Sequence, residues 1–149
     1  MKKPGYLTLL IGASALSLIS CCGAAGKTKI EVKNAMIMEV PSVQKNTGAF
    51  MEIFNHSGAD DTLVSAKSNI SEVTEIHKMV EDGDTMRMEK IDSIVVPAGS
   101  SAVLKRGGFD IMLIGLTKEI KDGDIAEINL NFKKAGNVKL EVPVKKLEM

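Results

Sequence analysis

Residues 73–91 read VTEIHKMVEDGDTMRMEKI and contain two short stretches of β-forming residues, 73–80 and 85–91. An Asp-Gly pair separates them, and such a pair is one of the strongest short-range signals for a hairpin turn. The stretch therefore predicts a β-hairpin with Asp82 and Gly83 at the two central positions of its turn. No stretch of a dozen residues in the chain keeps a helical period of 3.6 without a breaker or a β-branched cluster. We expect an all-β protein.

The rest of the chain repeats this pattern of short strands separated by turn residues. Pro97-Ala98-Gly99 and Gly107-Gly108 are two of the expected turns. Further strands are expected at residues 30–40, 48–55, 63–67, 101–105, 109–116, 125–133 and 138–144. A succession of short strands and turns is typical of an antiparallel β-sandwich or barrel. We expect one such domain over residues 30–149, because this length suits a single domain.

The predicted hairpin gathers four side chains that can bind a soft metal. With the turn placed as above, Met79 lies opposite Met86 and His77 lies opposite Met88. Side chains two residues apart on a strand point the same way, and directly opposed residues are close neighbours. All four side chains would therefore share one face of the hairpin.

The expected strand at 109–116 divides into two faces. Phe109, Ile111 and Leu113 form an apolar set that we assign to the core, whereas Asp110 and Met112 lie on the other face. If this strand neighbours the hairpin, Asp110 and Met112 complete a site at its edge.

The sulfur cluster has two interpretations at this point. Thioether sulfur selects Cu(I) and imidazole also suits copper, so the cluster can be a copper site. Methionine is also an ordinary core residue, so the cluster can be packing alone. Zinc is disfavoured because no cysteine follows Cys22 and the chain has only 2 histidines. The other histidine, His56, lies in a polar turn without sulfur nearby, and we expect no ligand role for it.

The N-terminus reads as an export signal. Lys2 and Lys3 precede an apolar stretch at residues 6–19, which is too short to span a membrane. The sequence Leu18-Ile19-Ser20-Cys21 is similar to the lipobox of bacterial lipoproteins. It predicts a lipoprotein signal peptide over 1–20, a lipidated Cys21 and a tether over 21–29. The domain would then be held on a membrane of the bacterial cell envelope, facing the periplasm or the exterior.

Composition and motifs exclude several functions. The 19 basic and 19 acidic residues balance and are interspersed, which argues against nucleic-acid binding. The chain has no Ser-His-acid motif, no phosphate-binding glycine loop and no His-Glu-x-x-His, so we expect no enzyme. The two Asp-Gly-Asp triplets at 82–84 and 122–124 lack the other ligands of a calcium loop and are predicted turns.

Segments across most of the expected domain resemble the PCuAC family of periplasmic copper chaperones. They include Gly48-Ala49-Phe50-Met51, Glu75-Ile76-His77-Lys78-Met79, Met86-Arg87-Met88, Val96-Pro97-Ala98-Gly99 and Met112-Leu113-Ile114-Gly115-Leu116. The family binds Cu(I) through the motif His, ten residues, Met, twenty-one residues, His, one residue, Met. His77, Met88 and Met112 match this spacing, and Asp110 stands at the second histidine.

The resemblance implies a cupredoxin-like β-sandwich that carries Cu(I) as cargo to a membrane acceptor. In the family this acceptor is the copper centre of cytochrome c oxidase subunit II, often reached through an assembly chaperone. Asp110 leaves three interpretations open, because carboxylate is a hard ligand and a poor replacement for imidazole on Cu(I). Met79 or Met86 can fill the position, the site can favour a harder or oxidised metal, or copper binding is lost. In that last case the domain would be a non-metal interaction module of the envelope.

Overall fold

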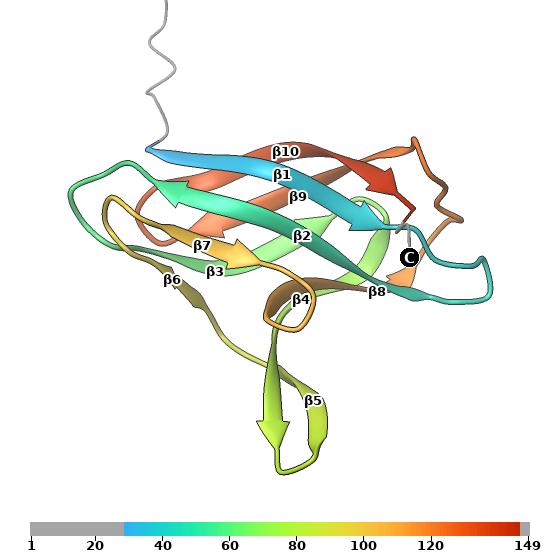
Figure 1. The fold of residues 1–149 in the computed structure, drawn as a ribbon. Helices are drawn as coiled ribbons and strands as arrows, with labels where there is room; N and C mark the ends of the chain where they lie inside the picture. Colours follow the sequence, from blue (N-terminus) through green and yellow to red (C-terminus); the bar gives the residue numbers. More distant parts are fainter. Residues whose placement is uncertain (1–28, 147–149) are drawn as a thin grey trace, which may run out of the picture.

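The computed structural model describes residues 29–146 (Figure 1). The predicted leader at 1–20, Cys21 and most of the tether lie outside the described residues. The described part contains ten strands: β1 (Ile30–Met38), β2 (Asn46–Asn55), β3 (Asp61–Ser68), β4 (Ser71–Asp82), β5 (Thr85–Lys90), β6 (Ile94–Val96), β7 (Ser101–Leu104), β8 (Phe109–Leu116), β9 (Ile125–Phe132) and β10 (Gly136–Lys145). No helix in residues 29–146 is long and apolar enough to cross a membrane.

The strands follow one another in the order β5-β4-β8-β7-β2-β1-β10-β9-β3-β6, and β2 also pairs with β8. Most neighbours are antiparallel, and a parallel pairing of β1 with β10 joins the two halves of the sheet. The sheet folds over so that β9, β10 and β3 lie behind the layer that contains β1, β2 and β8 (Figure 1). The all-β sandwich expected from the sequence is confirmed.

The core lies between the two layers, and every second side chain along a strand points into it. Ala49 on β2 and Ile111 on β8 are fully buried and lie opposite each other. From the second layer, Ile128 and Leu130 on β9 are buried in the same cluster. Because alternate residues point to the other face, the neighbours of Ile111 on β8 point away from this core.

All the strands expected from the sequence are present, with bounds shifted by a few residues. The expected strand at 109–116 has the same bounds as β8, whereas β4 extends beyond the expected 73–80 at both ends. The sequence interpretation missed β6, which has only three residues and pairs with the start of β3 at the edge of the sheet. A strand of three residues is too short to show alternation.

The predicted turn of the β4–β5 hairpin is wrong by one residue. Asp82 pairs with Thr85, so Gly83 and Asp84 occupy the central positions instead of Asp82 and Gly83. Gly83 has a φ of 65°, a left-handed conformation that glycine adopts without a steric cost at the first central position of a hairpin turn.

The shifted turn changes every cross-strand partner in the hairpin. The predicted register would have placed Lys78 opposite Arg87, whereas the observed register places Lys78 opposite Glu89. Opposite charges across two strands stabilise the pair and like charges destabilise it, so the observed register replaces an unfavourable pair at Lys78 by a favourable one. Met79 therefore lies opposite Met88, and His77 lies opposite Lys90. The partner offset is two residues, so the faces on which the side chains lie are unchanged.

Candidate metal centre

The candidate site lies on the outer face of the sheet, where β5, β4 and β8 run side by side. β8 neighbours the hairpin, as the sequence interpretation required, and His77 lies opposite Asp110. Met79 lies opposite Met88 on β5, and its backbone N–H donates to the carbonyl of Gly108 at 2.9 Å. The hairpin and the turn before β8 thereby converge over Asp110.

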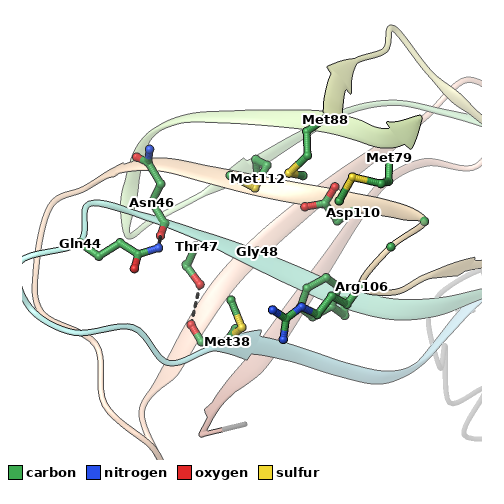
Figure 2. A pocket seen from close by; sticks show the side chains of 13 residues that line it. Met38, Gln44, Asn46, Thr47, Gly48, Met79, Met88, Arg106, Asp110 and Met112 are labelled. Atoms are coloured by element: carbon green, nitrogen blue, oxygen red, sulfur yellow. Dashed lines mark hydrogen bonds between the residues drawn. The ribbon is translucent and has the colours of Figure 1, made fainter. Parts of the chain in front are cut away.

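A cavity of about 300 Å³ opens between these strands and the loop that joins β1 to β2. Met79, Met88 and Met112 line it together with Asp110. Figure 2 shows the three thioethers gathered beside the Asp110 carboxylate, with Met38 on the opposite side of the cavity. Three of the predicted methionines and Asp110 are thus brought together, whereas His77 is not among the lining residues and lies opposite Asp110 on the neighbouring strand.

Gly48 on β2 leaves room for this cavity. It lies opposite Met112, and a Cβ atom added to it would come within 3.1 Å of Phe50 Cζ and 3.5 Å of Asp110 Oδ2. A side chain at this position would therefore press on the ring of Phe50, touch the carboxylate and reduce the space in the cavity.

Asp110 is buried although it lies on the face that points away from the core. Its exposed fraction is 5%, because the hairpin and the residues before β8 cover it. Its Oδ1 atom is buried without any hydrogen-bond partner among the described residues. Burial raises the pKa of the Asp110 carboxyl, and the charge of His77 offsets part of this effect. A buried polar atom without a partner is rare and costly, so it marks a place where a ligand atom or ion is expected.

His77 has one occupied and one free ring nitrogen. Its side chain is 15% exposed, and Nε2 lies 2.9 Å from Oε2 of Glu75. Nδ1 is buried and has no partner in the described part of the chain. The other oxygen of Glu75 accepts a hydrogen bond of 2.6 Å from Lys90 Nζ. Hydrogen bonds from Lys90 and then from His77 lower the pKa of Glu75.

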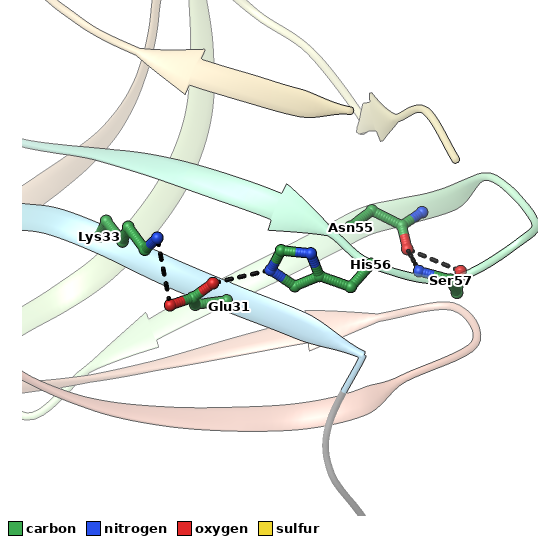
Figure 3. Close-up of polar contacts among 5 residues, drawn as sticks. All are labelled: Glu31, Lys33, Asn55, His56 and Ser57. Atoms are coloured by element: carbon green, nitrogen blue, oxygen red, sulfur yellow. Dashed lines mark hydrogen bonds and ion pairs between the residues drawn. The ribbon is translucent and has the colours of Figure 1, made fainter. Parts of the chain in front are cut away.

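Two other predicted positions have different surroundings. Met86 is 54% exposed, lies opposite Glu81 and does not line the cavity. His56 does not line the cavity; its Nε2 lies 2.7 Å from Oε2 of Glu31 (Figure 3), and its ring is stacked on that of Phe54. That His56 has no ligand role stays a prediction.

The sequence analysis did not identify three residues of the site. Met38 and Arg106 line the cavity, and Glu75 holds His77. Met38 comes from β1 and reaches the cavity through the pairing of β1 with β2, which no local spacing reveals. Glu75 had a local signal, because it lies two residues before His77 and shares its face of the strand.

The chemistry of the site depends on sulfur. Within residues 29–146 no group of three or more His, Cys, Asp or Glu side chains is placed to hold a metal ion. A harder ion such as Mg²⁺ or Ca²⁺ needs several oxygen ligands, and these are not gathered here. Three thioethers and one free imidazole nitrogen instead suit a soft cation, whereas the Asp110 carboxylate is a hard ligand.

Comparisons with known proteins agree with this architecture. Residues 30–144 match the model of the family described as "Putative lipoprotein LpqE-like". The protein "Putative lipoprotein Lxx21020" of Leifsonia xyli subsp. xyli is 30% identical over 100 residues, which span 66% of this chain and 60% of that protein.

Solved structures show the same fold. A copper-bound PCuAC domain from PmoF2 superposes with a TM-score of 0.69 at 23% identity, covering 80% of this chain and 94% of that domain. The Cu(I) form of DR1885 from Deinococcus radiodurans has a TM-score of 0.62 at 25% identity, covering 74% of each chain. The chain therefore belongs to the LpqE-like family, and its domain has the cupredoxin-like fold of PCuAC domains.

Proposed function

We propose that this protein is a lipid-anchored Cu(I) carrier that binds the ion between β4, β5 and β8. The observation that carries the proposal is the pair of orphaned buried atoms, Nδ1 of His77 and Oδ1 of Asp110. They lie on directly opposed residues of neighbouring strands, and Asp110 lines the cavity together with three thioethers. Each unpartnered buried polar atom costs about 1–3 kcal/mol, and a bound cation would remove that cost.

The ligands that we propose are His77, Met88 and Met112, with Met79 as the fourth. Met79 replaces Met86 as the preferred additional thioether because it lies opposite Met88 and lines the cavity. A set of one imidazole and neutral thioethers matches the softness of Cu(I).

Asp110 contributes to this site mainly through its negative charge and only weakly as a ligand. A carboxylate is a hard ligand, so it binds Cu(I) weakly. As a buried anion it balances the single positive charge of the ion, because opposite charges attract more strongly at a buried group than in bulk water.

The comparisons support copper as the cargo and lipid as the anchor. Two of the similar structures are described as copper-bound, one of them in the Cu(I) form. The matching family and the Leifsonia protein are both described as lipoproteins. For this chain the anchor would be Cys21, the last residue of the lipobox-like sequence.

A carrier of this kind releases its ion by ligand exchange. The cavity is open to solvent on the side of Met88, whose side chain is among the exposed apolar residues. An acceptor could therefore offer its own ligands to the ion while His77, whose Nδ1 atom is buried, still holds it. Anchoring on a membrane raises the effective concentration of the carrier near a membrane-bound acceptor. The family resemblance favours the copper centre of cytochrome c oxidase, directly or through an assembly chaperone.

The test is competition for Cu(I) between the purified protein and a chromogenic chelator under reducing conditions. We expect wild type to bind one Cu(I), and His77→Ala to compete at least about tenfold less well, which corresponds to about 1.4 kcal/mol. His56→Ala is the matched control and should compete like wild type, because His56 pairs with Glu31. Asp110→His should bind more tightly. Equal and poor competition by wild type and His77→Ala would refute the proposal.

A further inference from the structure

Glu75 and His77 form a fixed pair on β4. They lie two residues apart and therefore on the same face of the strand. Oε2 of Glu75 lies 2.9 Å from Nε2 of His77, and Oε1 lies 2.6 Å from Nζ of Lys90. Both carboxylate oxygens are thus engaged, so Glu75 is held between a cation and the imidazole ring.

This pair determines which ring nitrogen carries the hydrogen atom. An ionised carboxylate only accepts hydrogen bonds, so Nε2 of His77 must be the donor to Glu75. Neutral imidazole has one N–H group, and its second nitrogen then keeps a free lone pair. That second nitrogen is Nδ1, which is buried without a partner in residues 29–146.

The geometry points to Glu75 as a positioning residue that holds His77 in the Nε2–H tautomer and leaves Nδ1 as the atom offered to the metal. The second half of this statement rests on the proposed copper function, whereas the tautomer does not. In metal sites an outer carboxylate that accepts the second ring N–H of a ligating histidine fixes its orientation and increases its basicity.

Asp110 is a second carboxylate beside His77, but it accepts no hydrogen bond from the imidazole ring. It lies opposite His77, yet no hydrogen bond joins them, and each keeps an unpartnered buried atom. If His77 donated to Asp110 through Nδ1, that nitrogen would no longer have a lone pair for a metal. By taking the hydrogen on the far side of the ring, Glu75 leaves both His77 and Asp110 free.

Lys90 on β5 holds Glu75 from the neighbouring strand. Lys90 lies opposite His77, from where it reaches Glu75. The register expected from the sequence would have placed Lys90 directly opposite Glu75, so a hydrogen bond between Lys90 and Glu75 fits either register. In the observed register this contact runs diagonally between the two strands.

The test is nitrogen NMR of the full chain labelled with ¹⁵N, before any metal is added. With only 2 histidines in the chain, His56→Ala assigns the His77 signals. We expect an unprotonated Nδ1 and a protonated Nε2 in wild type. Glu75→Ala should give a mixture of tautomers, and Glu75→Gln should retain the Nε2–H form because its amide oxygen still accepts a hydrogen bond. Glu81→Ala, an exposed acid on the same face, is the control and should change nothing.

Cu(I) is then added, which is diamagnetic and leaves the nitrogen signals observable. We expect the Nδ1 signal to shift while Nε2 stays protonated, and Glu75→Ala to lower Cu(I) affinity about 10–100-fold. A wild-type Nδ1–H tautomer, or a tautomer ratio that Glu75→Ala leaves unchanged, would overturn the positioning role. Metal coordination through Nε2 would overturn the assignment of Nδ1. If Cu(I) shifts neither nitrogen, the copper function fails, and the metal-free spectra still decide the role of Glu75.

Discussion

Two buried aspartates of this domain should respond in opposite directions to the same substitution. Asp110 and Asp61 have exposed fractions of 5% and 4%. Oδ1 of Asp110 has no partner among the described residues. Asp61 accepts backbone N–H groups from Thr62, Lys134 and Ala135 at 2.8–2.9 Å and so ties the start of β3 to the turn between β9 and β10. Asp110 thus has an oxygen without a hydrogen-bond partner, whereas both oxygens of Asp61 accept hydrogen bonds.

The magnitudes follow from these contacts. Asp110→Asn replaces an unpartnered buried charge by a neutral amide of the same shape, and we expect a gain of about 1–2 kcal/mol in the free energy of unfolding of the metal-free protein. Asp61→Asn turns one acceptor oxygen into a donor that faces an N–H group, and we expect a loss of about 1.5–3 kcal/mol. Each kcal/mol shifts the melting temperature of a domain of this size by about 4 °C.

The assay is urea and thermal unfolding followed by circular dichroism, with a copper chelator present. Asp82→Asn is the control, because Asp82 is exposed at the end of the hairpin, and it should leave the unfolding free energy within about 0.5 kcal/mol of wild type. A loss of stability in Asp110→Asn similar to that in Asp61→Asn would refute the reasoning, because it would mean that the Asp110 carboxylate makes stabilising contacts in the metal-free state.

Three further predictions concern Asp61, the thioethers of the cavity and Gly48. Burial by itself raises the pKa of Asp61, but the backbone hydrogen bonds outweigh it and the net pKa is lowered. The carboxylate therefore stabilises the fold at pH values above the unfolded pKa of about 3.9, and this stability is lost as the pH falls through the lower pKa of the folded state. The unfolding free energy of Asp61→Asn should accordingly depend less on pH in this acid range than that of wild type. Met88→Leu and Met112→Leu should each weaken Cu(I) binding about tenfold or more in chelator competition while changing stability by less than about 1.5 kcal/mol, whereas Met86→Leu should bind like wild type. Gly48→Ala should fold, because the nearest atom is the far end of a ring, but should weaken Cu(I) binding by crowding the cavity; unchanged affinity would argue against ligation there.

The strands could be predicted from the sequence because both of their signals are local. Alternation of apolar residues identified β8, where Ile111 and Leu113 are buried as expected and Phe109 packs against the core. Turn residues separated the strands from one another. The strand β6 was missed because three residues carry no period, and its identity as a strand depends on pairing with β3.

The hairpin register could be predicted only in part. The tripeptide at 82–84 offers two ways to place glycine in the turn, and the sequence interpretation chose the wrong one. The like-charge pair of Lys78 and Arg87 in that register was the signal against it. His77, Met79 and Met88 nevertheless share one face of the hairpin, as predicted. Side chains alternate between the two faces of a strand, so a shift of two residues leaves each side chain on the same face.

The interior of the site could not be predicted, because it depends on tertiary covering. Asp110 lies on the outer face of β8, where a polar residue is normally exposed, and it is buried only because the hairpin and the residues around Gly108 lie over it. Met38 reaches the same cavity through the β1–β2 pairing. These long-range contacts follow from the order of strands in the sheet, which the sequence pattern alone does not specify.

Copper K-edge X-ray absorption on the Cu(I)-loaded full chain tests the central claim most directly, because it counts the atoms around the ion. The proposed site predicts one nitrogen and two or three sulfur scatterers, with the sulfur contribution reduced in Met88→Leu and Met112→Leu and the nitrogen contribution lost in His77→Ala. A spectrum with only nitrogen and oxygen neighbours, or a sulfur contribution that survives both methionine substitutions unchanged, would contradict a thioether site between β4, β5 and β8.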